Sequence, residues 1–99
     1  MKVLINYLKE EYYLSADQQD HINQRHPEAT TELISICLLN PLEIRKSSSN
    51  KIAHLYYIIK NKQRFFCVIL KICEDGNYIS TAYTTNKIKH GDIIFKKEN

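Results

Sequence analysis

Two histidines and an arginine lie close together in the stretch HINQRHPE, His21 to Glu28. On an α-helix His21 and Arg25 are four residues apart and therefore share one face. His26 lies about 140° further round the helix than His21, but it precedes Pro27 and so need not keep helical backbone angles. The sequence therefore predicts that all three side chains point into one cleft.

An imidazole beside a guanidinium suits the binding and cleavage of a phosphodiester. Histidine exchanges a proton near neutral pH, and arginine supplies a fixed positive charge with paired donors. RNA can be cleaved without a metal because its own 2′-hydroxyl attacks the adjacent phosphorus, provided that a base removes that proton, an acid protonates the leaving oxygen and donors stabilise the added charge. A zinc site fits poorly, because helical zinc ligands favour i, i+4 histidines and the chain has neither H-E-x-x-H nor a cysteine cluster.

Candidate hydrogen-bond donors follow far downstream in STAYTT, Ser80 to Thr85. Side chains alternate across a strand, so Thr81, Tyr83 and Thr85 are expected on one face. A row of hydroxyl groups on one face is what a phosphate cradle requires. The alternative is that threonine and tyrosine are simply good strand formers on a solvated face.

Helices are expected to carry the histidine motif. Ser15 and Gln18 have the spacing of a capping box, which predicts a helix over 16–26 that ends before Pro27. Pro27 suits the first turn of a second helix that runs to about residue 40, with Glu28 in that turn, where a carboxylate favours the helix dipole. The two helices should meet at a corner beside His26.

Strands are expected to carry the hydroxyl row. The polar run KSSSN at 46–50 separates the helical part from a β-rich part. Apolar and β-branched runs predict strands over 52–59, 64–73 and 77–84, with further short strands over 9–14 and 93–96. The connections leave room only for hairpin turns, and Asp75-Gly76 is a strong turn signal. The predicted fold class is α+β, with N-terminal helices packed on one face of an antiparallel β-sheet.

Composition limits the remaining possibilities. A chain of 99 residues predicts a single domain over 1–99, and no apolar run is long enough for a membrane span, which points to the cytoplasm. Three cysteines in apolar runs predict buried, reduced thiols.

The two parts of the chain differ in charge. Residues 1–43 contain three basic and seven acidic residues, whereas 44–99 contain eleven basic and four acidic. The C-terminal part could therefore face an anion such as a nucleic-acid backbone, although the charge alone favours lysines that merely solubilise strand edges and turns.

The pair of motifs HINQRHPE and ISTAYTTNKIKHGD resembles the barnase, EndoU, colicin and RelE-like (BECR) nuclease superfamily. The closest likeness is to its small phage- and toxin-associated branch, whose members carry an H-I-x-x-R-H-P-E helix end and a late T-A-Y-x-T strand followed by I-K-x-G. The resemblance extends from about Ser15 to Phe95. It implies a BECR or RelE-like fold and a metal-independent ribonuclease that needs no cofactor.

The resemblance also implies a role for individual residues. His21 would be the main acid/base group, Arg25 and His26 would bind phosphate or share proton transfer, and Thr81 with Tyr83 would contact the phosphate. Two accessory positions that bind substrate would be Thr85 and Lys89. The substrate would be transfer RNA or another cellular RNA, and a neutralising antitoxin or immunity protein would control the activity.

The sequence therefore leads to three hypotheses. The first is a small RNA endonuclease, acting as the toxin of a toxin–antitoxin pair or as a stand-alone effector. The second is a catalytically inactive RNA- or protein-binding module, which would bind RNA in a salt-dependent manner without turnover. The third, a metal-dependent hydrolase that uses His21 and His26, is disfavoured by the ligand spacing.

Overall fold

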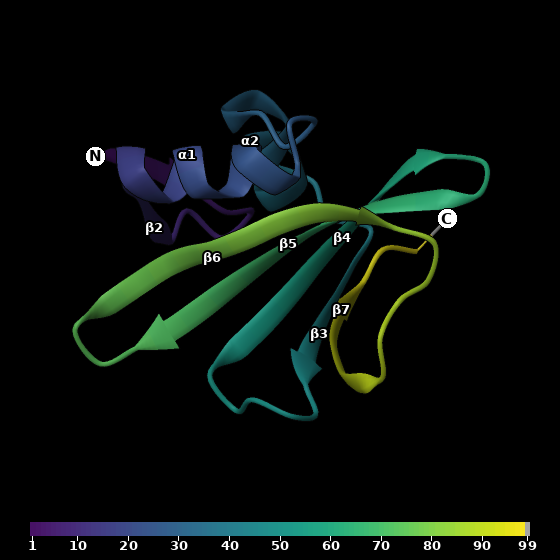
Figure 1. Cartoon of the computed structure of the whole chain (residues 1–99). Coiled ribbons are helices and arrows are strands. Elements are labelled where there is room, and N and C mark those ends of the chain that lie inside the picture. Colours follow the sequence, from purple (N-terminus) through teal and green to yellow (C-terminus); the bar gives the residue numbers. More distant parts are fainter. Residues whose placement is uncertain (99) are drawn as a thin grey trace.

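The computed structural model describes residues 1–98, and within them all the strands join one seven-stranded sheet. In chain order the elements are β1 (Lys2–Ile5), β2 (Glu11–Leu14), α1 (Ala16–Arg25), α2 (Thr31–Leu39), β3 (Glu43–Ser47), β4 (Ala53–Asn61), β5 (Arg64–Cys73), β6 (Gly76–Thr85) and β7 (Gly91–Lys96). Figure 1 shows the strands fanning out below the two helices.

The sheet is mixed in direction. Its strand order is β1-β2-β6-β5-β4-β3-β7, and neighbouring strands are antiparallel except β2 and β6, which are parallel and meet at Tyr13 and Tyr78. Beyond Tyr78, β6 pairs with β5 on one side, and no strand of the described residues pairs with its other side. The rest of β6 is therefore a free sheet edge, and helix α1 lies against it.

The predicted fold class, α+β with N-terminal helices on an antiparallel, RelE-like sheet, is wrong. Of the described residues 49% lie in strands and only 19% in helices, the chain begins with two strands rather than helices, and β2 pairs with β6 in parallel. The sequence missed β1 because its residues are mostly exposed and show no alternation, and it missed β3 because the end of that strand overlaps the polar run 46–50, which was expected to be a loop. The β2–β6 pairing joins residues far apart in the chain, which no local pattern can reveal.

Other predicted elements are confirmed with small shifts. Strands β4, β5 and β6 form the expected antiparallel hairpins, and Gly76 closes the second hairpin opposite Cys73 with a positive φ of 148° that favours glycine. Helix α1 begins and ends where expected. The second helix starts later than predicted, because Thr30 caps it through Leu33 N–H, and Glu28 lies in the preceding turn.

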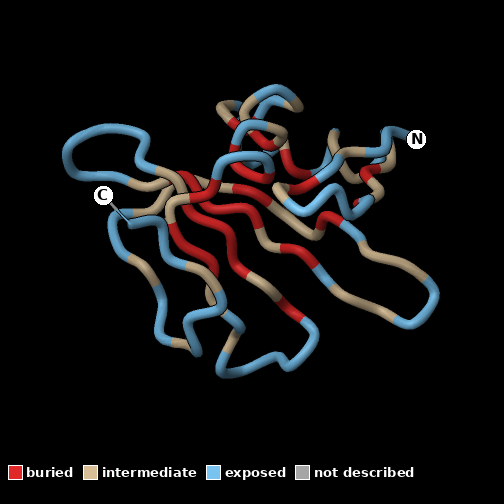
Figure 2. Tube along the Cα trace, turned by 180° about the vertical axis from the view of Figure 1, so that it is seen from behind, coloured by how far each residue is buried: buried red, intermediate tan, exposed pale blue. Residues whose placement is uncertain are grey.

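Both helices cover one face of the sheet and form the main core with it (Figure 1). α2 packs against β1, β4 and β5, and α1 packs against β6. Figure 2 shows the buried residues gathered where the central strands pass the helices. The buried core residues are Tyr12, Leu14, Ile22, Ala29, Ile34, Cys37, Leu38, Ile44, Tyr56, Phe66, Val68, Leu70, Ile79 and Ala82.

The opposite face of the sheet, which we call the second face, has a smaller apolar cluster. Leu55, Tyr57 and Cys67 are its buried members, and Tyr83 packs against them. Part of this cluster lies under the connection from β6 to β7, residues 86–90, which contributes Ile88. The sheet therefore has two differently covered faces, and residues of β6 reach both.

Candidate functional site at the free edge of strand β6

Two side-chain hydrogen bonds, one at its N-cap and one to the edge of β6, hold the start of helix α1 in place. The Ser15 hydroxyl accepts a hydrogen bond from the backbone N–H of Gln18 at 3.0 Å, as the capping-box spacing predicted. The side chain of Gln18 does not turn back to complete the box. It donates instead to the backbone carbonyl of Ser80 on β6, so the helix that carries the histidines is held against the strand that carries the hydroxyl row.

Ser80 is itself an irregular residue of β6. Ile69 pairs with Thr81 and Leu70 pairs with Ile79, so Ser80 is the extra residue of a β-bulge. A bulge disrupts the ladder and re-aims nearby side chains. Beyond it, Thr81 lies opposite Ile69 on the second face, and its neighbour Ala82 is buried in the main core.

His21 and Arg25 lie exposed on α1. They follow Gln18 at three and seven residues, which puts all three along one row of the helix. Because Gln18 reaches Ser80, this row runs beside the free edge of β6. Within residues 1–98 neither His21 nor Arg25 makes a side-chain hydrogen bond or ion pair, so both are available to an external ligand.

His26 joins the helix motif to the strand motif. It is the C-cap of α1 with φ −133° and ψ 74°, so its backbone leaves helical geometry as expected before Pro27. Its ring lies 5.8 Å from the ring of Tyr83, centroid to centroid, at an angle of 41°. The half-buried imidazole thus stands beside the predicted hydroxyl row, at the edge of the sheet.

The predicted alternation of β6 beyond the bulge is confirmed. Thr81, Tyr83 and Thr85 pair with residues of β5 that belong to the second face, and Thr84 lies on the helix side. Burial, together with the nearby thiol of Cys67, raises the pKa of Tyr83 to about 12. The Tyr83 hydroxyl therefore stays protonated at neutral pH and can serve as a hydrogen-bond donor but not as a base.

A second polar group, which the sequence did not predict, lies on the helix side of the same strand. The Thr84 hydroxyl donates to the Glu28 carboxylate at 2.8 Å and accepts from the Lys60 ammonium at 3.0 Å. Burial alone would raise the pKa of Glu28, but the Thr84 hydrogen bond, a backbone N–H and the charges of Lys60 and His26 outweigh it and lower this pKa. Glu28 is thus held as a carboxylate close to His26.

The two accessory residues differ in their position: Thr85 is the last residue of β6, two positions after Tyr83, whereas Lys89 lies in the connection to β7. Thr85 exchanges hydrogen bonds with the backbone of Lys87, at 3.2 and 3.5 Å, and so shapes the turn after β6. The backbone N–H of Lys89 donates to the Tyr57 hydroxyl at 3.1 Å. Lys89 also lines a separate pocket on the second face.

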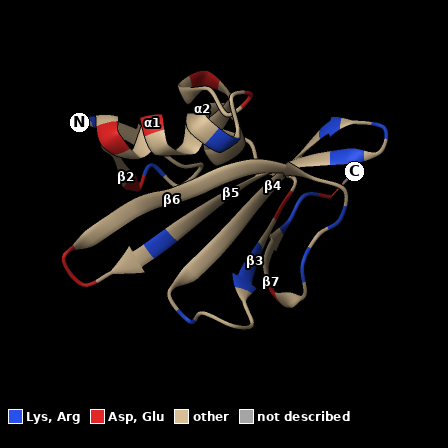
Figure 3. Ribbon diagram, viewed as in Figure 1, with Lys and Arg blue, Asp and Glu red and all other residues tan. Residues whose placement is uncertain are grey.

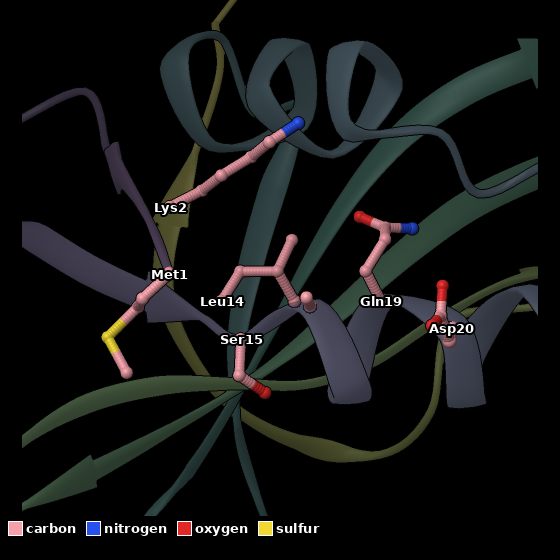
Figure 4. Close-up of a pocket in the computed structure, with 7 residues that line it drawn as sticks. Met1, Lys2, Leu14, Ser15, Gln19 and Asp20 are labelled. Carbon is pink, nitrogen blue, oxygen red and sulfur yellow. The ribbon is translucent and has the colours of Figure 1, made fainter.

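The molecule has other hollows that do not contain the predicted catalytic residues. Figure 4 shows one of about 250 Å³ between the N-terminal strand and the first turns of α1, where Lys2, Gln19 and Asp20 surround Leu14. A polar hollow of about 280 Å³ lies where β6 ends and is lined by Arg64, Thr84, Thr85 and Asn86. Of the predicted site residues, only Thr85 contributes to either hollow.

Two further properties of the described residues bear on the possible chemistry. In residues 1–98 no three histidine, cysteine, aspartate or glutamate side chains gather in a way that could hold a metal ion. Neither α1 nor α2 is long and apolar enough to cross a membrane.

Comparison with known proteins gives no match, since no protein-family model, no curated protein and no solved structure is significantly similar to the chain. The residues brought together at the β6 edge are therefore the basis for a functional proposal. His26 and Tyr83 are in contact, His21 and Arg25 lie on the adjoining helix row, and Thr81 shares the face of Tyr83. The sequence missed the Gln18–Ser80 and Glu28–Thr84 contacts, because nothing local in either segment signals its distant partner.

Proposed function

We propose that this protein is a metal-independent endoribonuclease whose active site is the free edge of β6. The observation that carries the proposal is the contact between the imidazole of His26 and the ring of Tyr83. It unites the helix motif and the strand motif, on which the resemblance to the BECR nucleases rests. The exposed pair His21 and Arg25 on the same helix adds a second imidazole and a guanidinium.

The proposed reaction uses the 2′-hydroxyl of the RNA as the nucleophile. One of the two imidazoles, His21 or His26, removes the 2′-hydroxyl proton as that oxygen attacks the phosphorus, and the other protonates the departing 5′ oxygen. Arg25 offsets the charge of the phosphate, and the hydroxyls of Thr81 and Tyr83 donate to its oxygens. The P–O5′ bond breaks, and the products carry a 2′,3′-cyclic phosphate and a 5′-hydroxyl.

The protonation states support this division of roles. The raised pKa keeps the Tyr83 hydroxyl as a donor. The lowered pKa keeps Glu28 as a carboxylate, which accepts the hydrogen bond from Thr84 and so ties the turn after α1 to β6. Glu28 acts through its hydrogen bond with Thr84 of β6 in this scheme and is therefore a positioning residue.

The test is cleavage of labelled total RNA in EDTA by the purified protein and by His21→Ala and His26→Ala variants. Loss of an acid/base group is expected to lower the cleavage rate by about 100-fold or more. Gln24→Ala, an exposed change on the same helix, is the matched control and should cleave normally. Circular dichroism should show every variant folded.

Wild-type-like cleavage by folded His21→Ala and His26→Ala proteins would contradict the proposal, as would activity that EDTA abolishes. If all the proteins bind RNA in a salt-dependent manner and none cleaves it, a binding module becomes the better description.

The biological setting follows from the same resemblance. We propose that the protein acts in the cytoplasm on transfer RNA or another cellular RNA, as a toxin or effector held in check by a neutralising protein. Expression of the wild type should then arrest growth and deplete an RNA species. Expression of His26→Ala should do neither.

A further inference from the structure

A pocket of about 270 Å³ with both polar and apolar lining residues opens on the second face of the sheet, away from the helices. One wall is the connection 86–90, which is fixed over the sheet by Ile88 in the apolar cluster and by the hydrogen bond from Lys89 N–H to the Tyr57 hydroxyl. This wall contributes Lys89 and His90 to the lining. We call the hollow the serine-loop pocket.

The opposite wall is the serine loop, residues 47–50. The Ser47 hydroxyl accepts hydrogen bonds from the backbone N–H groups of Ser49 and Asn50, both at 3.2 Å, and so orders the loop. The floor between the walls consists of Ala53, Leu55 and Ile69 from the two central strands.

The chemistry of the lining selects an anionic ligand with an apolar part. Two lysines, Lys71 and Lys89, line the pocket together with His90 and three serines, and none of the lining residues among 1–98 is an aspartate or a glutamate. Ammonium groups and hydroxyls bind phosphate oxygens. The apolar floor suits the face of a base, and the volume, just below the range of small-molecule pockets, suits one nucleotide rather than a larger ligand.

The pocket also lies in line with the proposed cleavage site. Ile69 in its floor pairs directly with Thr81 on the same face of the sheet. Strand geometry separates the centre of the pocket from Tyr83 by about 10 Å. A single RNA strand bound at the β6 edge therefore passes into the pocket without crossing to the helix side.

We infer that the serine-loop pocket binds a nucleotide of single-stranded RNA that flanks the cleaved bond, with its phosphate held by Lys71 and Lys89. This inference rests on the proposed ribonuclease function for its location, but binding can be measured without cleavage. Figure 3 shows a basic band on β5 and further basic residues on the β6–β7 connection, whereas the acidic residues lie chiefly on the helices and in the turns.

The test measures binding of a fluorescent, fully 2′-O-methylated RNA oligonucleotide, which cannot undergo 2′-hydroxyl attack. The Lys71→Gln/Lys89→Gln double variant is expected to bind roughly tenfold more weakly at low salt, and its plot of log K against log salt should be less steep by about 1.4. Lys62→Gln/Lys97→Gln removes the same charge away from the pocket and serves as the control, which should bind about as the wild type does. Both lysine pairs are exposed, so folding should be preserved.

The pocket assignment would be overturned if the wild type does not bind the RNA or if both double variants weaken binding equally. It would also be overturned if inorganic phosphate displaces the labelled RNA at the same concentrations as unlabelled RNA does. The last result would indicate a simple anion pocket. Lysine-dependent binding by a protein that never cleaves RNA would support the pocket and reject the nuclease. Histidine-dependent cleavage with binding unaffected by Lys71 and Lys89 would do the reverse.

Discussion

Thr84 is a single residue whose hydroxyl group links three elements of the candidate site. It donates to Glu28 in the turn between the helices and accepts from Lys60 at the end of β4. Replacing it with valine keeps the shape and removes both hydrogen bonds. We expect Thr84→Val to lower the free energy of unfolding by about 1 kcal/mol at pH 7, whereas Thr84→Ser should retain most of it.

The effect of Thr84→Val should depend on pH in a defined direction. The pKa of Glu28 is lowered in the folded protein, so its contribution to stability is present above the unfolded-state pKa and is lost as pH falls through the folded-state pKa. Urea unfolding at pH 7 and at pH 3 should therefore show a clear difference between wild type and Thr84→Val at pH 7, and a smaller difference at pH 3 because the Glu28 carboxyl takes up protons as the pH falls. Equal differences at the two pH values would show that the Glu28 carboxylate is not involved.

At the residue scale the sequence predicted part of the candidate site. The proline after His26 indicated that this histidine leaves helical geometry, and strand alternation indicated that Thr81 and Tyr83 share a face. Both features are present in the structure. The role of Glu28 was misjudged because the sequence favoured an N-terminal helical position for it, and only the tertiary structure brings Thr84 to its carboxylate.

At the scale of elements, one side-chain hydrogen bond ties α1 to an irregular strand. Gln18 donates to the carbonyl of Ser80, which the bulge leaves at the free edge of β6. We expect Gln18→Ala to cost about 1 kcal/mol of stability and to speed hydrogen exchange of the α1 amides. RNA cleavage should fall by more than the change in folded fraction explains, because the histidine row is no longer held beside the strand.

Gln24→Ala provides the comparison for this prediction. Gln24 lies on the same helix, is exposed and makes no side-chain hydrogen bond within residues 1–98. Hydrogen exchange followed by mass spectrometry, with cleavage rates measured on the same samples, compares the two variants directly. If they behave alike, Gln18 does not position α1.

The elements also show where sequence patterns reach their limit. Long strands with clear alternation, β4 to β6, and a capped helix, α1, were predicted within a few residues. β1 was missed because it lacks alternation and β3 because it overlaps the polar run 46–50, whereas β2 was expected but its parallel partner was not. Sheet order and direction depend on pairings between distant segments, and these errors were enough to make the predicted fold class wrong.

At the scale of the whole molecule, the sheet separates two apolar layers, each with its own buried cysteine. Cys37 lies in the main core under the helices, and Cys67 lies in the cluster on the second face. Burial raises the pKa of the Cys37 thiol well above its usual value and that of Cys67 to about 12. Cys73, near the β5–β6 turn, is only partly buried.

These differences predict how the three thiols react. Because the thiolate is the reactive form, Ellman's reagent should modify Cys73 quickly in the native protein and modify Cys37 and Cys67 only as the layers open. Cys73→Ser should remove the fast phase and leave two slow thiols.

The rates at which Cys37 and Cys67 react with the reagent in increasing urea report on the two faces of the sheet separately. Equal reaction rates for Cys37 and Cys67 would mean that the helix layer and the second face open in one cooperative step. A faster reaction of Cys67 would show that the 86–90 connection, which contains Lys89 and His90, leaves the sheet before the helices do. Rapid modification of all three thiols without urea would contradict the two buried layers.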